Sequence, residues 1–106
     1  MLDIKELNRC WQVCVEEIHA DVAGKKSPRQ TVKNIIDLLG EDNAKETFAT
    51  IAQIKKHDGR IYPAEHEWAK NYPVNPENVE KYYNVRGLDA VHPAHIAQLL
   101  EEIRTM

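Results

Sequence analysis

The N-terminal part of the chain carries its apolar side chains at alternating spacings of three and four residues. This spacing places side chains on one face of an α-helix. It predicts a long helix over residues 3–22, with Cys10 at the flank of an apolar stripe. The stripe consists of Ile4, Leu7, Trp11, Cys14, Ile18 and Val22.

The next apolar pattern has recognisable signals at both ends. Ser27 is a favourable N-cap, Pro28 suits a first helical turn, and Gln30 completes a capping box with Ser27. Gly40 follows the last apolar position, where a glycine commonly ends a helix. The sequence predicts a helix that begins at Pro28 and presents Val32, Ile35, Ile36 and Leu39 on one face.

A third helix is expected to begin soon after Gly40, with Asp42 or Asn43 as its N-cap. It is expected to end near Asp58-Gly59. One side of this helix carries Ala44, Phe48, Ile51 and Ala52, with Ile54 at its edge.

Residues 60–95 are interrupted by prolines and by Gly87, which permits only short helices joined by extended links. One short helix is expected from Pro63 through Trp68 and Ala69. Another is expected from Asn75-Pro76 through Val79, Tyr82 and Tyr83. Alternatively, residues 72–74 and 83–86 form a small strand pair.

The last predicted helix begins at His92-Pro93 and carries Ile96, Leu99, Leu100 and Ile103 on one face. The fold class expected is therefore mainly α. We expect a compact single-domain bundle of about five to six helices over residues 1–106, because a chain of this length closes one modest hydrophobic core.

Composition agrees with a globular protein, since 42% of the residues are hydrophobic and 29% are charged. The net charge of −3 argues against a general nucleic-acid-binding protein, which usually presents a strongly basic face. The N-terminus is charged where a signal peptide would be apolar, and the two cysteines lie in a helical pattern. These features favour a cytoplasmic protein without a membrane segment.

Cys10, Cys14, His92 and His95 could together hold a zinc ion. Structural zinc sites usually draw their ligand pairs from tight turns, however, and here the two pairs lie far apart in the chain. Core packing of Cys14 is the favoured interpretation. We therefore expect no metal and no cofactor, and we keep this quartet only as a weak alternative.

Catalysis is not indicated by the remaining residues. Ser27 is explained as a helix cap, and no histidine lies at helix-contact spacing from either cysteine. The glycines at positions 24, 40, 59 and 87 are too dispersed to form a phosphate-binding loop. The chain is expected not to be an enzyme.

Two basic clusters could contact phosphates or an acidic partner, although each also suits a solvated helix end. They are Lys25-Lys26-Arg29-Lys33 and Lys55-Lys56-His57-Arg60. Tyr62 and Trp68 follow the second cluster, and aromatic residues among basic ones are common at recognition surfaces. The alternative is that Trp68 anchors a short helix to the core.

Residues 35–103 resemble an uncharacterised family of small domains encoded on bacterial conjugative elements, plasmids and phages. The resemblance rests on Leu39-Gly40, Ala52-Gln53-Ile54-Lys55, Asp58-Gly59-Arg60, Glu67-Trp68-Ala69-Lys70 and His92-Pro93, in this order. The sequence departs from the family pattern at His57, where a tryptophan is expected. The resemblance implies an accessory protein of a mobile element and supplies no catalytic residues.

Three functions follow from these observations. The first is a protein-binding module of a mobile genetic element, most concretely an anti-CRISPR type of inhibitor that covers a surface of a defence nuclease complex. The second is an accessory domain of the element's transfer machinery with weak nucleic-acid contact, and the third is a small zinc- or thiol-dependent enzyme. The binding residues expected are Lys55, Lys56, Arg60, Tyr62, Trp68, Tyr82, Tyr83 and Arg86. The apolar stripes suit a monomer and a helical dimer equally.

Overall fold

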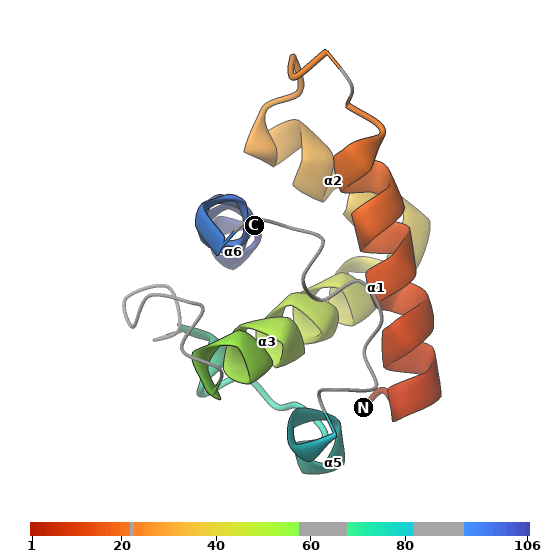
Figure 1. The fold of residues 1–106 in the computed structure, drawn as a ribbon, viewed down its shortest axis with the longest axis vertical. Helices are drawn as coiled ribbons and strands as arrows, with labels where there is room; N and C mark the ends of the chain where they lie inside the picture. Colours follow the sequence, from red (N-terminus) through yellow and green to blue (C-terminus); the bar gives the residue numbers. More distant parts are fainter. Residues whose placement is uncertain (22, 58–67, 82–92) are drawn as a thin grey trace.

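The computed structural model describes residues 1–21, 23–57, 68–81 and 93–106, and Figure 1 shows their arrangement. These residues form helices and contain no strand, which confirms the mainly α fold class. The helices are α1 (Ile4–His19), α2 (Pro28–Leu39), α3 (Glu41–His57), α5 (Pro76–Glu80) and α6 (Pro93–Thr105). Trp68 and Ala69 are also helical.

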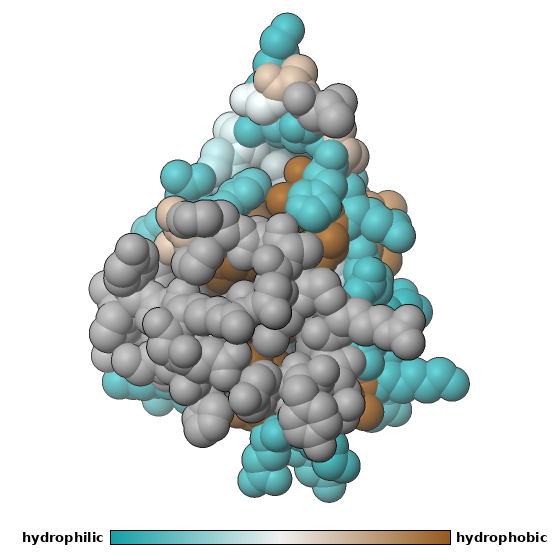
Figure 2. All heavy atoms as spheres, viewed as in Figure 1, coloured by the Kyte–Doolittle hydropathy of each residue, from teal (hydrophilic) through white to brown (hydrophobic). Residues whose placement is uncertain are grey.

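Helix α3 lies at the centre of the molecule and contacts α1, α2, α5 and α6. In Figure 1 it crosses the view between α6 and α5, while α1 runs steeply past its N-terminal end on the right. The described residues share one hydrophobic core, to which α1, α2, α3 and α6 contribute buried side chains and against which Val79 of α5 packs partly buried. On the face shown in Figure 2, hydrophobic residues of the described part are visible only in places among hydrophilic ones.

The sequence predicts burial along one side of α3. In the structure, the middle of the helix is buried around its full circumference. All residues from Thr47 to Ala52 are buried, and Ile54, expected at the edge, is completely buried. The two buried threonines satisfy their hydroxyl groups within the helix, because Thr47 Oγ1 donates to the carbonyl of Asn43 and Thr50 Oγ1 to that of Glu46, each at 2.7 Å. A polar residue type therefore fits a buried position without an unsatisfied donor.

Gly40 joins α2 directly to α3. Its N–H donates to the carbonyl of Ile36 at 2.7 Å, and its own carbonyl accepts from the N–H of Ala44 at 3.0 Å. The same residue thus ends one helix and begins the next. The expectation that Asp42 or Asn43 caps α3 is wrong, because both residues already lie in the first turn of the helix.

Helix α1 begins close to the predicted start but is shorter than predicted. Asp3 caps it by accepting a hydrogen bond from the N–H of Glu6 at 2.8 Å, and the helix ends at His19 instead of residue 22. Val22, the last residue of the predicted stripe, lies outside the described residues. Cys10, expected at the flank of the stripe, is fully buried. Trp11 lies edge-on to Phe48 of α3, with ring centroids 6.4 Å apart, which locks α1 against the central helix.

The start of α2 confirms Ser27 as N-cap, because its hydroxyl accepts from the N–H of Gln30 at 3.2 Å. The reciprocal half of the capping box is not formed. Gln30 instead donates its side-chain amide to Asn34 at 2.8 Å. The apolar face of α6 is confirmed completely, since Ile96, Leu99, Leu100 and Ile103 are all buried.

The proline-punctuated half is described only in part. Asn75 caps α5 by accepting from the N–H of Glu77 at 3.1 Å, as predicted, and residues 72–74 form a link without strand structure. The proposed strand partner at residues 83–86, the stretch from Pro63 to Glu67, and the expected helical extension to Tyr82 and Tyr83 lie outside the described residues.

Replacing Gly40 by alanine is expected to lower the free energy of unfolding by about 1–3 kcal/mol, as measured by urea denaturation. The backbone angles of Gly40, φ 86° and ψ 153°, fall in a region that is open almost only to glycine. No heavy atom lies within 4 Å of an added Cβ, so the cost comes from the backbone alone.

Asparagine at this position is expected to destabilise about as much, because ψ lies outside the left-handed region that asparagine tolerates. Lys33→Ala on the exposed face of α2 is the matched control and should leave the unfolding midpoint nearly unchanged. A Gly40→Ala protein as stable as the control would contradict this account.

Candidate functional site

A groove of about 430 Å³, open to solvent, lies between α3 and the segment that leads into α5. Its lining is mostly apolar, with a few polar side chains among it. The apolar and aromatic lining residues are Tyr72, Pro73, Val74, Pro76 and Val79, and the polar ones are Gln53, Lys70 and Glu80. A concave surface of this composition is typical of a binding site.

One wall of the groove is held to α3 by a side chain of α3 itself. Gln53 donates its side-chain amide to the carbonyl of Ala69 at 2.7 Å, and Ala69 is fully buried. The N–H of Tyr72 then donates to the same carbonyl at 3.1 Å, which closes a turn. This turn directs the chain out of the short helix and along the groove.

The other wall is held by the N-terminal segment. Asn78 of α5 donates to the carbonyl of Leu2 at 2.8 Å, and Asn75 donates to the same carbonyl at 3.4 Å. The N–H of Leu2 donates to the carboxylate of Glu46 on α3. Leu2 is buried, so these bonds tie α5 to α3 through a shielded backbone segment.

Aromatic side chains and carboxylates meet at one end of the groove. The rings of Trp68 and Tyr72 are 5.4 Å apart and inclined by 55°. Burial raises the pKa of Tyr72, and the negative charges of Asp42, Glu46 and Glu41 raise it further, while Lys45 opposes them. The hydroxyl group of Tyr72 therefore lies in a negative field from the first turns of α3.

Trp68 is the one predicted binding residue whose side chain is described. It is partly buried against the core, as expected for an anchor of the short helix, and partly exposed beside Tyr72; its binding role stays a prediction. Lys55 and Lys56 lie in the last turn of α3, and their side chains are outside the described set. Arg60, Tyr62, Tyr82, Tyr83 and Arg86 also lie outside the described residues and stay predictions.

The two cysteines are core residues. Cys10 and Cys14 are both fully buried and form no disulfide, and Arg9 donates to the sulfur of Cys10 at 3.6 Å. Burial raises the pKa of the Cys14 thiol, and the neighbouring Cys10 adds to this shift. His95 lies partly buried on α6, and His92 is outside the described residues. Within the described ranges, no group of three or more His, Cys, Asp or Glu residues could hold a metal ion.

Because the thiolate is the reactive form of cysteine, Cys10 and Cys14 should resist thiol reagents in the folded protein. Dithionitrobenzoate at pH 8 is expected to titrate almost no thiol before unfolding, and both thiols in guanidinium chloride. Rapid reaction of either thiol in the folded protein would show that the burial described for α1 does not hold in solution.

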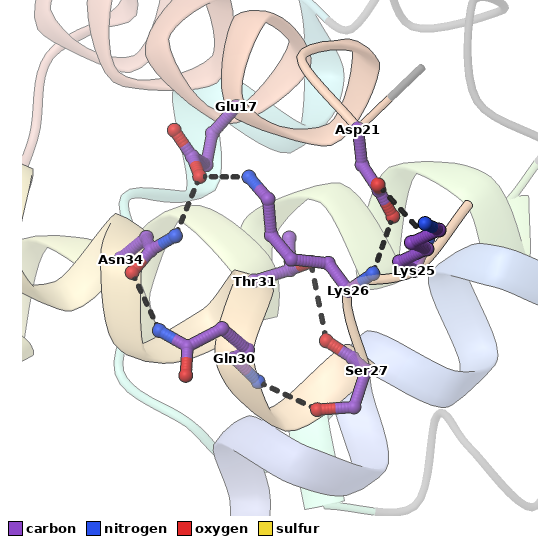
Figure 3. A network of polar contacts seen from close by, with 8 residues as sticks. All are labelled: Glu17, Asp21, Lys25, Lys26, Ser27, Gln30, Thr31 and Asn34. Carbon is purple, nitrogen blue, oxygen red and sulfur yellow. Dashed lines mark hydrogen bonds and ion pairs between the residues drawn. The ribbon is translucent and has the colours of Figure 1, made fainter. Parts of the chain in front are cut away.

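The basic cluster Lys25-Lys26-Arg29-Lys33 is partly neutralised by acidic partners, as Figure 3 shows for the turn between α1 and α2. The ammonium group of Lys26 lies 2.6 Å from Glu17, and Arg29 lies 3.4 Å from Glu102 of α6. Asp21 accepts from the backbone N–H groups of Lys25 and Lys26 at 3.0 and 2.8 Å. These contacts favour a structural role in joining α1 to α2 over a phosphate-binding role.

Because of these contacts, the contribution of Glu17 to the free energy of unfolding depends on pH. Its pKa is held below the usual value by hydrogen bonds from Lys26 and Asn34. The unfolded chain therefore binds this proton more readily than the folded protein. The stabilisation is complete above the unfolded-state pKa of about 4.3 and is lost as the pH falls through the lower folded-state pKa.

Glu17→Gln is expected to lower the free energy of unfolding by about 1 kcal/mol at pH 7, because the ion pair is only partly exposed. The difference from the unmodified protein should disappear as the pH is lowered toward 3. Urea denaturation across this pH range is the measurement. Glu16→Gln, the same change at an exposed position on α1, is the control and should have little effect at any pH.

Most of the groove was not anticipated from the sequence. Gln53 and Lys70 belong to two motifs that carry the family resemblance, but no pattern in the sequence indicates that the two motifs lie together. Their proximity depends on the hydrogen bond from Gln53 to Ala69. Tyr72 and Val74 stood in a proline-flanked link, and the closely spaced prolines at positions 73 and 76 were the available signal for a solvent-facing apolar segment.

This helical architecture with a groove beside α5 defines a small helical domain with a surface suited to binding. A family model described as "Protein of unknown function (DUF3849)" matches residues 4–106, and the chain belongs to this family. The expectation of an uncharacterised family is thereby confirmed. No curated protein matches the chain, and no solved structure matches it. In the described part of the chain, no helix is both long and apolar enough to cross a membrane.

Proposed function

We propose that the protein is a non-enzymatic protein-binding module whose binding surface is the groove between α3 and α5. The observation that carries this proposal is the combination of an open, mostly apolar groove with the partly exposed pair Trp68 and Tyr72 at its end. Tyrosine and tryptophan are enriched among the residues that dominate protein-binding energy. A polar rim with an apolar centre is also the usual composition of a protein interface.

The specific function that we propose is inhibition of a host defence system of the anti-CRISPR type, by covering a surface of a defence nuclease complex. Support comes from the resemblance to domains encoded on conjugative elements, plasmids and phages. The motifs that carry this resemblance include Gln53 and Trp68-Ala69-Lys70, which lie in or beside the groove. A mobile-element protein with an aromatic binding surface fits this role without catalytic residues.

The two alternative functions receive less support. An accessory domain that touches nucleic acid would use its basic clusters, but Lys26 and Arg29 already pair with carboxylates. A thiol enzyme would need an accessible thiolate, but Cys10 and Cys14 are buried and the pKa of Cys14 is raised. We therefore place protein binding first.

Affinity purification from a lysate of a host with an active CRISPR system tests this proposal. The full chain should retain subunits of the defence nuclease complex, as identified by quantitative mass spectrometry. Tyr72→Ala and Glu80→Lys should reduce this retention toward background, because both residues line the groove. Lys33→Glu on the exposed face of α2 is the control and should retain the complex fully.

A phage-plating assay gives the functional readout. Expression of the chain should raise plating of a CRISPR-targeted phage, and Tyr72→Ala should lose this effect while Lys33→Glu keeps it. Unfolding midpoints of all variants establish that any loss is not due to unfolding. If no defence complex is retained and plating does not change, the inhibitor function is wrong. If retention by Tyr72→Ala and Glu80→Lys equals that of the control, the groove is not the binding surface.

A further inference from the structure

The link between Tyr72 and α5 offers backbone groups to a ligand. Pro73 and Pro76 have no N–H, and within the described part of the chain no hydrogen bond is made by the N–H or the carbonyl of Val74. Tyr72 and Asn75 each precede one of these prolines, and a residue before a proline favours extended backbone. Asn75 is extended, with φ −73° and ψ 117°. Val74 therefore has an unused donor and an unused acceptor, in a link without helix or strand structure that lines the groove and in which the prolines favour extended backbone.

Such a segment can bind a second extended chain through main-chain hydrogen bonds. Main-chain pairing does not depend on the sequence of the ligand, so specificity must come from the side chains around it. In this groove, Tyr72 and Val79 provide apolar contact area beside Val74. A ligand with apolar side chains, proline among them, fits these walls, because aromatic and proline-lined grooves suit extended proline-containing peptides.

The charged side chains around the groove determine which charge on a ligand is favoured. Glu80 lines the groove, and Asp42 and Glu46 contribute negative field at Tyr72. Lys70 is the one cation among the lining residues that the structure describes. Negative charge therefore exceeds positive charge at the Tyr72 end.

The neighbouring charged pairs do not reverse this balance. Glu41 and Lys45 lie 2.8 Å apart and largely cancel each other. Glu77 in the first turn of α5 and Lys81 at its C-cap are exposed and opposite in sign. The groove thus complements a positive side chain better than a negative one.

We infer that the groove binds an extended peptide segment of a partner protein that carries apolar residues, including proline, next to an arginine. This inference rests on the proposed function, protein binding through the groove, and adds the chemistry of the partner. The arginine can stack on the exposed part of Tyr72 or Trp68 and approach the carboxylate of Glu80. Lysine lacks the planar group that stacks in this way, so arginine is the better anchor.

The test uses the full chain and short fluorescein-labelled peptides, with binding followed by fluorescence anisotropy. The first peptide alternates proline and leucine and carries two arginines at one end. Its twin has glutamates in place of the arginines, and a third peptide has N-methylated amides along the apolar stretch. The arginine peptide should bind, and its affinity should fall as salt is added, because exposed charges are screened. The glutamate twin and the N-methylated peptide should each bind at least about fivefold more weakly.

Variants of the protein locate this binding in the groove. Glu80→Gln should weaken binding of the arginine peptide by about two- to fivefold, the effect of one exposed ion pair. Tyr72→Ala should weaken it by about tenfold or more, as expected for a central aromatic contact. Asp37→Asn, the same loss of one negative charge on the exposed face of α2, is the control and should bind as tightly as the unmodified protein.

Equal affinity for the arginine peptide and its glutamate twin would overturn the inference, as would unchanged binding by both Tyr72→Ala and Glu80→Gln. Failure of the peptide assay differs from failure of the proposed function. If the groove variants lose the defence complex in the lysate experiment but no peptide binds, protein binding stands and the extended arginine-containing ligand is wrong.

Discussion

The fold depends on the burial of the middle of α3, residues 47–52, on all sides. This part of the helix cannot have a solvated polar face, and its sequence meets the constraint with alanines and with threonines whose hydroxyl groups bond to carbonyls of the same helix. Small side chains such as Ala49 and Ala52 let neighbouring helices approach closely, while Phe48 fills the space toward α1. Among the described residues, α1, α2 and α6 are amphipathic helices packed against α3, and none of them has to be stable alone.

Short segments in the second half of the chain obtain their order from side chains that bond to backbone. Helix α5 has only five residues, and a helix this short is not stable without further contacts. Asn78 compensates by binding the carbonyl of Leu2, and Gln53 does the same for the carbonyl of Ala69. These polar bonds fix both walls of the groove relative to α3, with partly exposed apolar side chains such as those of Tyr72, Val74 and Val79 along it.

The sequence was most informative where structure depends on neighbours along the chain. The stripes of α1 and α6 and the caps at Ser27 and Asn75 follow from local spacing, and the structure confirms them. All-round burial of α3 could not be predicted, because threonine looks polar until its hydroxyl is seen to bond within the helix. The groove was also inaccessible to sequence reasoning, since it depends on contacts between residues as distant as Leu2 and Asn78. Trp68 was recognised as important, but its ring partner Tyr72 was not.

The direct join at Gly40 limits how the length of this chain can vary. Each residue added to a helix turns everything that follows by about 100°, so an insertion at this join would rotate the face of α3 relative to α2. Because the middle of α3 is buried on every side, such a rotation would misplace side chains in all of its contacts at once. The described residues between α1 and α2, 20–21 and 23–27, differ, since most of them are exposed and they are held by the side chains of Asp21 and Glu17. We therefore expect changes in chain length to be accommodated between α1 and α2, while the corner between α2 and α3 keeps a fixed length.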